Sequence, residues 1–577
     1  MTARLTNGSF ANTFIKETNK FIEVNGWYMA DMIEVSDNSN SNPWDLCLGD
    51  FIDSCVSYEP GKVFIEIAGQ KISYGKMQEY SKRSASMFKS LGIGYGDRVC
   101  LYLPNCAEFL YAWFGLSRIG AIAVPVNTAY KTAETAYILN DAEASAVVGH
   151  VDMLGSLREA VSLCDSVNHC LIVDPVRESY RTEHHKDWID FTSRMETSDM
   201  YPDNIDISPS DVSMLVYTSG TTGNPKGVQV THKMYVAAGQ GFAHWTHATE
   251  KDRFFTCLPY FHANAQYYST MGALAARATL IVSDRFSASA FWDQVREAEA
   301  TVVNFIGMMM PVLSKQDPKD SDLDNTVRLF YGSPAFDPEF LAEFQKRFGT
   351  DIIVGFGMTE TCYGTIESIG EFRRPNSSGL ARRHPDQRFS NQIRIVDSDG
   401  NPISNGDIGE ITINNPVLMT GYWRNPEQTD LALRNGWLFT GDLGWLDDDG
   451  YLYFVDRKKD VIRRRGENIS SQEVEDVIKR HPDVLDCAVI AVPSELGEDD
   501  VKAYILPKGE NSVSPESVVY WCSEHLAYFK VPRYIEMRTE LPRTPSLRVR
   551  KDMLRSEKDD LIGGCFDLDK SGIDIRS

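Results

Sequence analysis

Two patterns of hydrophobic residues alternate along the early part of the chain. Apolar residues recur at helical spacing over residues 74–91, 107–119 and 133–140, and short apolar runs cover residues 98–103, 121–126 and 144–148. The first pattern predicts amphipathic helices and the second predicts buried strands. Because strands that alternate with helices indicate βαβ units and parallel sheet, the chain is predicted to have an α/β fold.

The alternation continues beyond residue 210. Apolar runs predict strands over residues 214–217, 254–258, 301–306 and 351–354. Thr231 is placed to cap a helix that runs to about residue 242. Toward the C-terminus, Ser470 and Glu473 form a capping box for a helix through residue 480. Strands over residues 488–492 and 501–506 then predict a smaller α+β unit.

Length and composition limit the architecture. A chain of 577 residues is too long for one core and predicts two to four domains. Hydrophobic residues make up 42% and charged residues 24%, which is typical of a globular protein. Residues 1–43 are polar and end in an Asn- and Ser-rich stretch, so we predict an N-terminal extension with a connector. The charged residues 176–208 show no pattern and predict a surface connection.

Charge and cysteine usage exclude several classes of partner. The net charge of −23 argues against nucleic acid and anionic membranes, so an anionic ligand needs a local basic site. The 11 cysteines include no C-x-x-C pair, which indicates reduced thiols in an intracellular, cytoplasmic protein. No apolar run approaches 18 residues, and no membrane span is expected.

A loop rich in glycine and hydroxyl residues follows the strand predicted over residues 214–217. Its candidate phosphate-binding residues are Thr218, Ser219, Gly220, Thr221, Thr222, Gly223 and Lys226. Backbone N–H groups in such a loop can surround a phosphate, hydroxyls add donors, and the lysine adds a positive charge. The spacing differs from the Walker pattern G-x-x-x-x-G-K-[ST].

This loop resembles the phosphate loop of the AMP-forming, adenylate-forming superfamily, which includes acyl-CoA synthetases. At least six motifs follow in the family's order between about residues 44 and 577. The resemblance implies a large AMP-binding domain over residues 44–457, built from stacked α/β subdomains and a β subdomain. It also implies a small mobile α+β domain over residues 458–577, with a hinge near Lys459. The ligands implied are ATP or AMP, Mg²⁺ and coenzyme A.

The nucleotide and metal roles follow from the same resemblance. Phe356 would stack on adenine, Thr359 would bind the α-phosphate, and Glu360 with Thr218 would hold Mg²⁺, since a carboxylate suits a hard cation. Asp442 resembles the aspartate that binds the ribose hydroxyls, and Arg457 a ribose or phosphate contact. The remaining residues of these motifs are Gly332, Ser333, Pro334, Gly355, Gly357 and Met358.

Other motifs resemble the acyl side of the site. His262 resembles the histidine that lies near the substrate carboxylate; amino-acid-adenylating relatives usually carry Asp there, which disfavours an amino-acid substrate. Asn264, Gly307 and Met308 resemble acyl-pocket positions. Methionine can line an irregular apolar pocket, which favours an apolar acyl group, but core packing explains this methionine equally well.

The small domain would supply the thioester-forming contacts. Gly466 resembles the glycine that admits the pantetheine thiol. Arg463, Arg464 and Arg465 either meet CoA phosphates or form a solvated run of charge.

One position departs from the family. Its members usually carry P-x-T-x-x-G-K near the C-terminus, and that lysine bridges the substrate carboxylate and the α-phosphate; this chain has Leu547 and Arg548 there. Loss of the glycine, and the tail over residues 566–572, resemble carnitine-CoA-ligase-like members. Arginine keeps the charge in a bulkier, planar group. Lys458, Arg550 and Lys551 are nearby cations that could substitute.

Several functions therefore stay open. The chain is a complete acyl-CoA ligase with Arg548 in the lysine role, a slow one, or an enzyme that only thioesterifies an acyl-adenylate made by a partner enzyme. Loading of a carrier protein and non-catalytic nucleotide binding are the alternatives. A homo-oligomer is compatible with all of these.

Overall fold

The computed structural model describes most of the chain from residue 45 onward. The described ranges are 45–174, 188–201, 206–218, 225–307, 309–333, 335–370, 373–386, 390–458, 460–464, 467–494, 499–509, 512–544, 548–573 and 575. The predicted N-terminal extension lies outside them. So do the predicted site residues Ser219, Gly220, Thr221, Thr222, Gly223, Met308, Pro334, Lys459, Arg465 and Gly466.

Seven strands form the first sheet, in the order β7-β6-β5-β3-β4-β8-β9. They are β3 Arg98–Tyr102, β4 Ile122–Pro125, β5 Ala146–His150, β6 His169–Val173, β7 Ile189–Asp190, β8 Val212–Thr218 and β9 Lys226–Thr231. All neighbours pair in parallel except β9, which is antiparallel to β8. The associated helices are α3 Tyr74–Ser90, α4 Ala107–Arg118, α5 Thr132–Asp141, α6 Leu154–Val161 and α8 Phe191–Glu196. The predicted α/β alternation is confirmed.

A second sheet has the order β15-β14-β13-β12-β10-β11-β1-β2 and is parallel from β14 to β1. Its strands are β1 Val63–Ile67, β2 Gln70–Ser73, β10 Arg253–Thr256, β11 Thr279–Val282, β12 Val302–Asn304, β13 Leu329–Gly332, β14 Asp351–Met358 and β15 Thr361–Ile366. The β1–β2 hairpin was not predicted. It comes from the beginning of the described chain, yet Ile65 pairs with Leu280 of β11.

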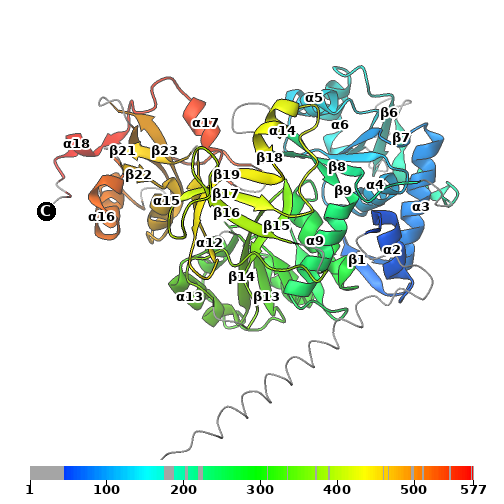
Figure 1. Ribbon diagram of the computed structural model, residues 1–577, viewed down its shortest axis with the longest axis horizontal. Helices are drawn as coiled ribbons and strands as arrows, with labels where there is room; N and C mark the ends of the chain where they lie inside the picture. Colours follow the sequence, from blue (N-terminus) through cyan, green and yellow to red (C-terminus); the bar gives the residue numbers. More distant parts are fainter. Residues whose placement is uncertain are drawn as a thin grey trace, which may run out of the picture.

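The helices that accompany the first and the second sheet meet in one hydrophobic core. Every residue of α4 except Glu108 is buried, as expected of a helix covered on all sides. Helix α9 (His232–Trp245) is nearly as buried, and Thr231 caps it as predicted by accepting from the Met234 N–H at 3.3 Å. Residues of both sheets belong to the same cluster, and Figure 1 shows the two halves side by side. The remaining helices here are α2 Leu48–Val56, α10 Met271–Ala275, α11 Phe291–Glu297, α12 Met309–Ser314 and α13 Pro338–Phe348.

An antiparallel sheet completes the large domain. It consists of β16 Gln392–Val396, β17 Gly409–Asn414, β18 Leu433–Arg434, β19 Trp437–Leu446 and β20 Leu452–Arg457, with α14 Pro426–Ala432 beside it. Strand β20 ends where the chain turns toward the C-terminal region.

The C-terminal region has hydrophobic clusters of its own. Its elements are the hairpin β21 Ile462–Arg464 and β22 Glu467–Ile469, α15 Ser471–Lys479, the sheet β23 Val484–Pro493, β24 Asp499–Pro507, β25 Tyr534–Met537 and β26 Phe566–Asp567, and the helices α16 Pro515–His525, α17 Lys551–Ser556 and α18 Leu568–Ser571. Ser470 caps α15 as predicted, accepting from the Glu473 N–H at 3.2 Å. Lys315 of the large domain reaches across and donates to the Val484 carbonyl at 2.7 Å.

A buried ion-pair network holds this small domain together. The Arg464 Nε lies 2.9 Å from Asp500 Oδ1, and both side chains are only 6% exposed. Arg464 also donates to the carbonyls of Phe529 and Val531, while Arg533 reaches the other oxygen of Asp500 at 2.8 Å. Removing one partner of a buried pair leaves an uncompensated charge and is strongly destabilising.

We therefore expect Asp500→Ala to destabilise the small domain by about 3 kcal/mol. Hydrogen–deuterium exchange of β24 peptides in the full-length protein would show this as an acceleration of about 10²-fold. Asp293→Ala is the matched control, because Asp293 pairs with Arg296 at the surface with 71% of its side chain exposed, and exposed pairs contribute little. Equal exchange in the two variants would contradict a structural role for Asp500.

Candidate active site

Several of the predicted site residues follow strands at the carboxyl edge of the second sheet. Strands β10, β12, β13 and β14 run parallel, so the segments that follow them emerge on the same side. Those segments carry His262, Gly307, Ser333 and Thr359. Ligands of open α/β sheets bind at this edge.

The stem of the phosphate loop is well defined. Thr218 at the end of β8 pairs with Lys226 at the beginning of β9, and the tip of the loop lies outside the described residues. The Tyr217 hydroxyl donates to Asp141 Oδ2 at 2.6 Å. The Tyr137 hydroxyl donates to the Pro225 carbonyl at 3.0 Å. These two tyrosines fix both ends of the loop to α5.

Lys226 points back toward the predicted metal-binding residue. Its Nζ donates to Gln428 Oε1 at 2.9 Å and lies 4.6 Å from the centre of the Tyr422 ring. The Tyr422 hydroxyl in turn donates to Glu360 Oε1 at 2.9 Å. Burial raises the pKa of Glu360, whereas the positive charges of Lys226 and Arg457 oppose this effect.

The donor set around Glu360 fits Mg²⁺ only when phosphates contribute. No group of three or more His, Cys, Asp or Glu side chains that could hold a metal occurs in the described part of the chain. Mg²⁺ is usually held by one or two carboxylates together with substrate phosphates. A single buried carboxylate beside a phosphate loop meets that requirement.

Glycines keep the edge of the sheet open where backbones approach closely. A Cβ on Gly332 would lie 2.3 Å from the Phe305 carbonyl oxygen, and one on Gly355 would lie 2.7 Å from that of Thr365. A Cβ on Gly357 would lie 3.0 Å from the Tyr268 hydroxyl oxygen. A Cβ on Gly332 or Gly355 would collide with backbone, so these two positions need glycine for steric reasons alone, whereas the tight contact at Gly357 is with the end of the Tyr268 side chain.

Strand β14 is longer than predicted. The apolar run ends at residue 354, but pairing with the antiparallel β15 extends the strand through Phe356 to Met358. The Phe356 ring is half-buried, 6.2 Å from the centre of the Phe454 ring. The Thr359 carbonyl accepts from the Tyr267 hydroxyl at 3.0 Å, which fixes the turn before Glu360.

Asp442 and Arg457 face each other across β19 and β20. The Arg457 Nε lies 3.7 Å from Asp442 Oδ1. Burial raises the pKa of Asp442 to about 6, although the charges of Arg457 and Arg548 favour its ionised form.

Arg548 lies near the tip of a short hairpin. Its carbonyl accepts a hydrogen bond from the Thr544 N–H at 2.7 Å, and Arg543 forms an antiparallel β-bridge with Val549. The Arg457 guanidinium is the main cause of a lowered Arg548 pKa of about 10, opposed by Asp442 and Asp460. Arg548 is exposed to solvent and remains positively charged at neutral pH.

The three rival cations have other partners. Lys551 donates to Ser471 Oγ at 2.6 Å and lies 2.7 Å from Glu475 Oε1. Lys458 pairs with Glu410 at 3.0 Å, and Arg550 pairs with Asp552 at 2.8 Å. Of the four candidate cations, Arg548 is the one whose charge acts on both His262 and Asp442.

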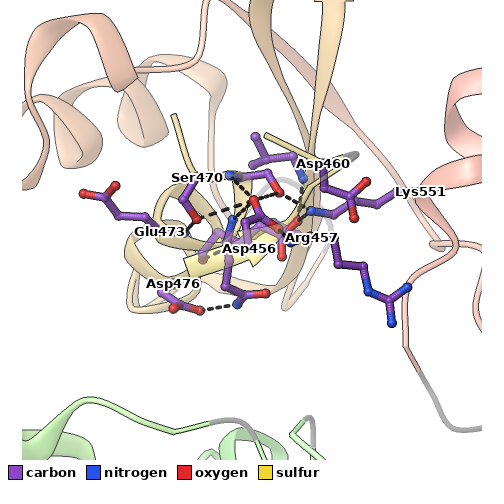
Figure 2. A network of polar contacts seen from close by, with 12 residues as sticks. Asp456, Arg457, Asp460, Ser470, Glu473, Asp476 and Lys551 are labelled. Carbon is purple, nitrogen blue, oxygen red and sulfur yellow. Dashed lines mark hydrogen bonds and ion pairs between the residues drawn. The ribbon is translucent and has the colours of Figure 1, made fainter. Parts of the chain in front are cut away.

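The Lys551 network joins the end of β20 to the small domain. Figure 2 shows Asp456, which precedes the predicted hinge, turned toward the beginning of α15. Asp456 Oδ2 accepts from the Ser471 N–H at 2.6 Å and from the Ser471 hydroxyl at 2.7 Å. A carboxylate is favoured at a helix N-terminus by the helix dipole.

His262 is neutral at physiological pH. Burial, and then the charge of Arg548, lower its pKa to about 4. Its Nε2 is buried and has no hydrogen-bond partner among the described atoms. A neutral imidazole can donate or accept one hydrogen bond at this nitrogen, depending on its tautomer.

The residues predicted for the acyl pocket and for CoA lie in different environments. Asn264 lies at the site edge and accepts from Asn304 Nδ2 at 3.2 Å. Met309 and Met310, which follow the predicted pocket residue, are fully buried in the core. In this conformation Arg464 does not face a ligand, because Asp500 and two carbonyls engage its buried guanidinium. Arg463 has an exposed side chain and a backbone N–H bonded to Asp499 at 3.1 Å.

Four residues of the site were assigned no role from the sequence: Asp141, Asn304, Tyr422 and Gln428. Asn304 carried a signal, because it is the one amide in the apolar run of residues 301–306. The others depend on long-range contacts such as Lys226 to Gln428, which spacing does not encode.

None of the helices in the described part of the chain combines the length and apolar content needed to cross a membrane. Two family models match the sequence. Residues 53–423 match "AMP-binding enzyme" and residues 473–548 match "AMP-binding enzyme C-terminal domain".

Individual proteins agree with the family models. The chain is 36% identical to crotonobetaine/carnitine–CoA ligase of Salmonella agona (strain SL483), covering 84% of this chain and 93% of the relative. The structure of anthranilate CoA ligase AuaEII in complex with anthranoyl-AMP matches with a TM-score of 0.81 and 25% identity, over 91% of this chain and 99% of that one.

MatB from Rhodopseudomonas palustris provides a comparison of two states. Its ATP-bound structure matches with a TM-score of 0.78 and 27% identity, over 90% of this chain and all of that one, and its apo structure with 0.67 over 89% and 99%. The fold therefore lies nearer the ATP-bound form. Taken with the site described above, these matches show that the chain belongs to the AMP-binding, adenylate-forming enzyme family and is an acid–thiol ligase of the acyl-CoA synthetase type, using ATP, Mg²⁺ and coenzyme A.

Proposed function

We propose that this chain is a complete acyl-CoA ligase in which Arg548 replaces the usual lysine. In the first step a carboxylate attacks the α-phosphorus of ATP, giving an acyl-adenylate and pyrophosphate. In the second step the CoA thiol attacks the acyl carbon, giving the thioester and AMP. The single observation that carries the proposal is the position of Arg548, whose charge acts on Asp442, Arg457 and His262 together.

The chain's own residues divide the work of the first step. Lys226 and the loop stem would hold the pyrophosphate side, and Glu360 would hold the Mg²⁺, which supplies charge neutralisation at the phosphates. Neutral His262 would donate a hydrogen bond from its free ring nitrogen to an oxygen of the substrate carboxylate. Arg548 would neutralise the charge that develops on the α-phosphate, the kind of preorganised stabilisation that contributes most to rate.

Electrostatics support an anion between Arg457 and Arg548. The two guanidinium groups repel each other, as the lowered pKa of Arg548 indicates. A carboxylate or phosphate placed between them removes that repulsion and can accept two hydrogen bonds from a planar guanidinium. The greater likeness to ATP-bound than to apo MatB also supports a domain orientation suited to this step.

A second candidate is supported by the same substitution. A guanidinium is larger and less compact than the ammonium it replaces, so it could fill the space that the α-phosphate needs. The chain would then only thioesterify an acyl-adenylate supplied by a partner enzyme. The acceptor would be coenzyme A or, alternatively, the phosphopantetheine arm of a carrier protein.

Substitution of Arg548 separates these functions. Arg548→Ala is expected to lower acid-dependent ATP–pyrophosphate exchange by about 10²–10³-fold, whereas Arg548→Lys retains exchange. Thioester formation from a synthetic acyl-adenylate should stay within about threefold of wild type in both variants. Arg550→Ala is the matched control, because Arg550 pairs with Asp552 at the surface. If Arg548→Ala leaves exchange unchanged, Arg548 has no role in adenylation.

The raised pKa of Asp442 predicts a pH-dependent affinity for nucleotide. Asp442 is ionised above its pKa of about 6. As the pH falls through that value it loses its charge, and with it the capacity to accept hydrogen bonds from two ribose hydroxyls. The KM for ATP is therefore expected to rise about 10-fold between pH 7 and pH 5. His262 stays neutral in this range, since its pKa is about 4.

Steady-state kinetics in ATP at a series of pH values would test this expectation. Asp442→Asn removes the titrating group, so its KM should be raised and should no longer depend on pH between 5 and 7. A wild-type KM that stays flat over this range would refute the assignment of Asp442 to the ribose.

A further inference from the structure

A buried amide, Asn304, meets a half-buried one, Asn264, at the carboxyl edge of the second sheet. Asn304 ends β12, is 1% exposed, and donates through Nδ2 to Asn264 Oδ1 at 3.2 Å. Asn304 Oδ1 is buried and has no partner among the described atoms. Buried polar atoms in folded proteins are nearly always hydrogen-bonded, so this acceptor needs an explanation.

The number of hydrogen-bond donors and acceptors left for a third partner does not depend on how the two amides are oriented. Each asparagine side chain has one acceptor oxygen and two donor protons on its nitrogen. One bond between the two uses a single donor and a single acceptor. If both amides are turned over, Asn264 becomes the donor and Asn304 the acceptor, and one oxygen and one NH₂ group still remain for a third partner.

The surrounding elements place this amide pair at the same sheet edge as His262 and Gly332. Asn264 follows His262 by two residues, and Asn304 pairs in register with Tyr331, directly before Gly332. After Asn264 the chain enters a π-helix over Ala265–Thr270, a conformation found frequently at functional sites. The pair therefore lies at the same sheet edge as the segment that carries His262, and Asn264 is itself a predicted acyl-pocket residue.

We propose that Asn264 and Asn304 recognise a hydroxyl group on the acyl chain, so that the substrate is a hydroxylated carboxylic acid. This inference rests on the ligase function proposed above and names its substrate class. A hydroxyl donates one proton to the free amide oxygen and accepts one from the free NH₂ group. An apolar acyl chain offers no hydrogen-bond partner to either amide. A quaternary ammonium has no N–H group and cannot donate to the free amide oxygen. The proposed hydroxylated acid therefore differs from the apolar acyl group that the methionines favoured in the sequence.

Matched pairs of acids test the proposal. Straight-chain and aromatic acids, each with a hydroxyl at successive positions and each with its deoxy counterpart, would be given to the wild-type enzyme with ATP, Mg²⁺ and CoA. At one hydroxyl position we expect kcat/KM to exceed that of the deoxy acid by about 10²-fold or more, because a site built to bind a hydroxyl rejects the analogue that lacks it. The synthetic adenylates of the same acids serve as a parallel series.

Variants identify the residues responsible. Asn304→Leu and, separately, the half-buried Asn264→Leu should each reduce the preference to within about threefold of unity. Asn325→Leu is the matched control: its amide bonds the carbonyls of Asp322 and Phe348, outside the edge segments of the site, so the preference should be unchanged.

The outcomes separate this inference from the function on which it rests. If deoxy acids react as well as every hydroxylated partner in the wild-type enzyme, the hydroxyl proposal is wrong and the ligase stands. If no acid and no adenylate gives thioester, the ligase function itself fails. A preference that survives both asparagine variants would also overturn the assignment.

Discussion

The positive charges of Arg457 and Arg548 repel each other, and this repulsion is the electrostatic constraint from which the proposed function follows. Asp442 and Asp460 offset part of it, yet the pKa of Arg548 still falls to about 10. Such a cluster attracts a carboxylate and a phosphate together. In a chain with a net charge of −23, we propose that it is the local basic site that an anionic substrate needs.

The position of Arg548 depends in turn on contacts at the start of the small domain. Lys551, three residues further on, is held by Ser471 at the beginning of α15 and by Glu475 in the middle of that helix. The same Ser471 donates to Asp456, the last residue but one of β20. Figure 2 shows Asp456 and Lys551 of this network. A carboxylate that precedes the predicted hinge thus fixes both the helix and the base of the arginine-bearing hairpin.

The sequence predicted the parts of the fold that local patterns encode. The strand–helix alternation up to residue 150 is confirmed, as are the caps at Thr231 and Ser470. The β1–β2 hairpin was missed because its partner strand β11 lies more than 200 residues further along the chain. The extension of β14 was missed because pairing with β15, and not an apolar run, defines it.

The site was predicted less completely for the same reason. Glycines such as Gly332 stand in motifs because a Cβ would collide with the neighbouring strand, so the motif carried the structural information. The run of three arginines does not predict that Arg464 turns into the small domain. The ion pair of Arg464 with Asp500 joins residues 36 positions apart, which a local pattern does not encode. The buried amide of Asn304 indicates a polar site only together with Asn264, and their hydrogen bond joins residues 40 positions apart.

The most direct test is to measure both half-reactions of the wild-type enzyme with one panel of acids. ATP–pyrophosphate exchange reports the first step, and thioester formation from synthetic acyl-adenylates and CoA reports the second. A complete ligase with Arg548 in the lysine position predicts that an acid whose adenylate is thioesterified also supports exchange. Rapid thioester formation from adenylates, with no exchange for any corresponding acid, would contradict it and assign the chain to the second step alone.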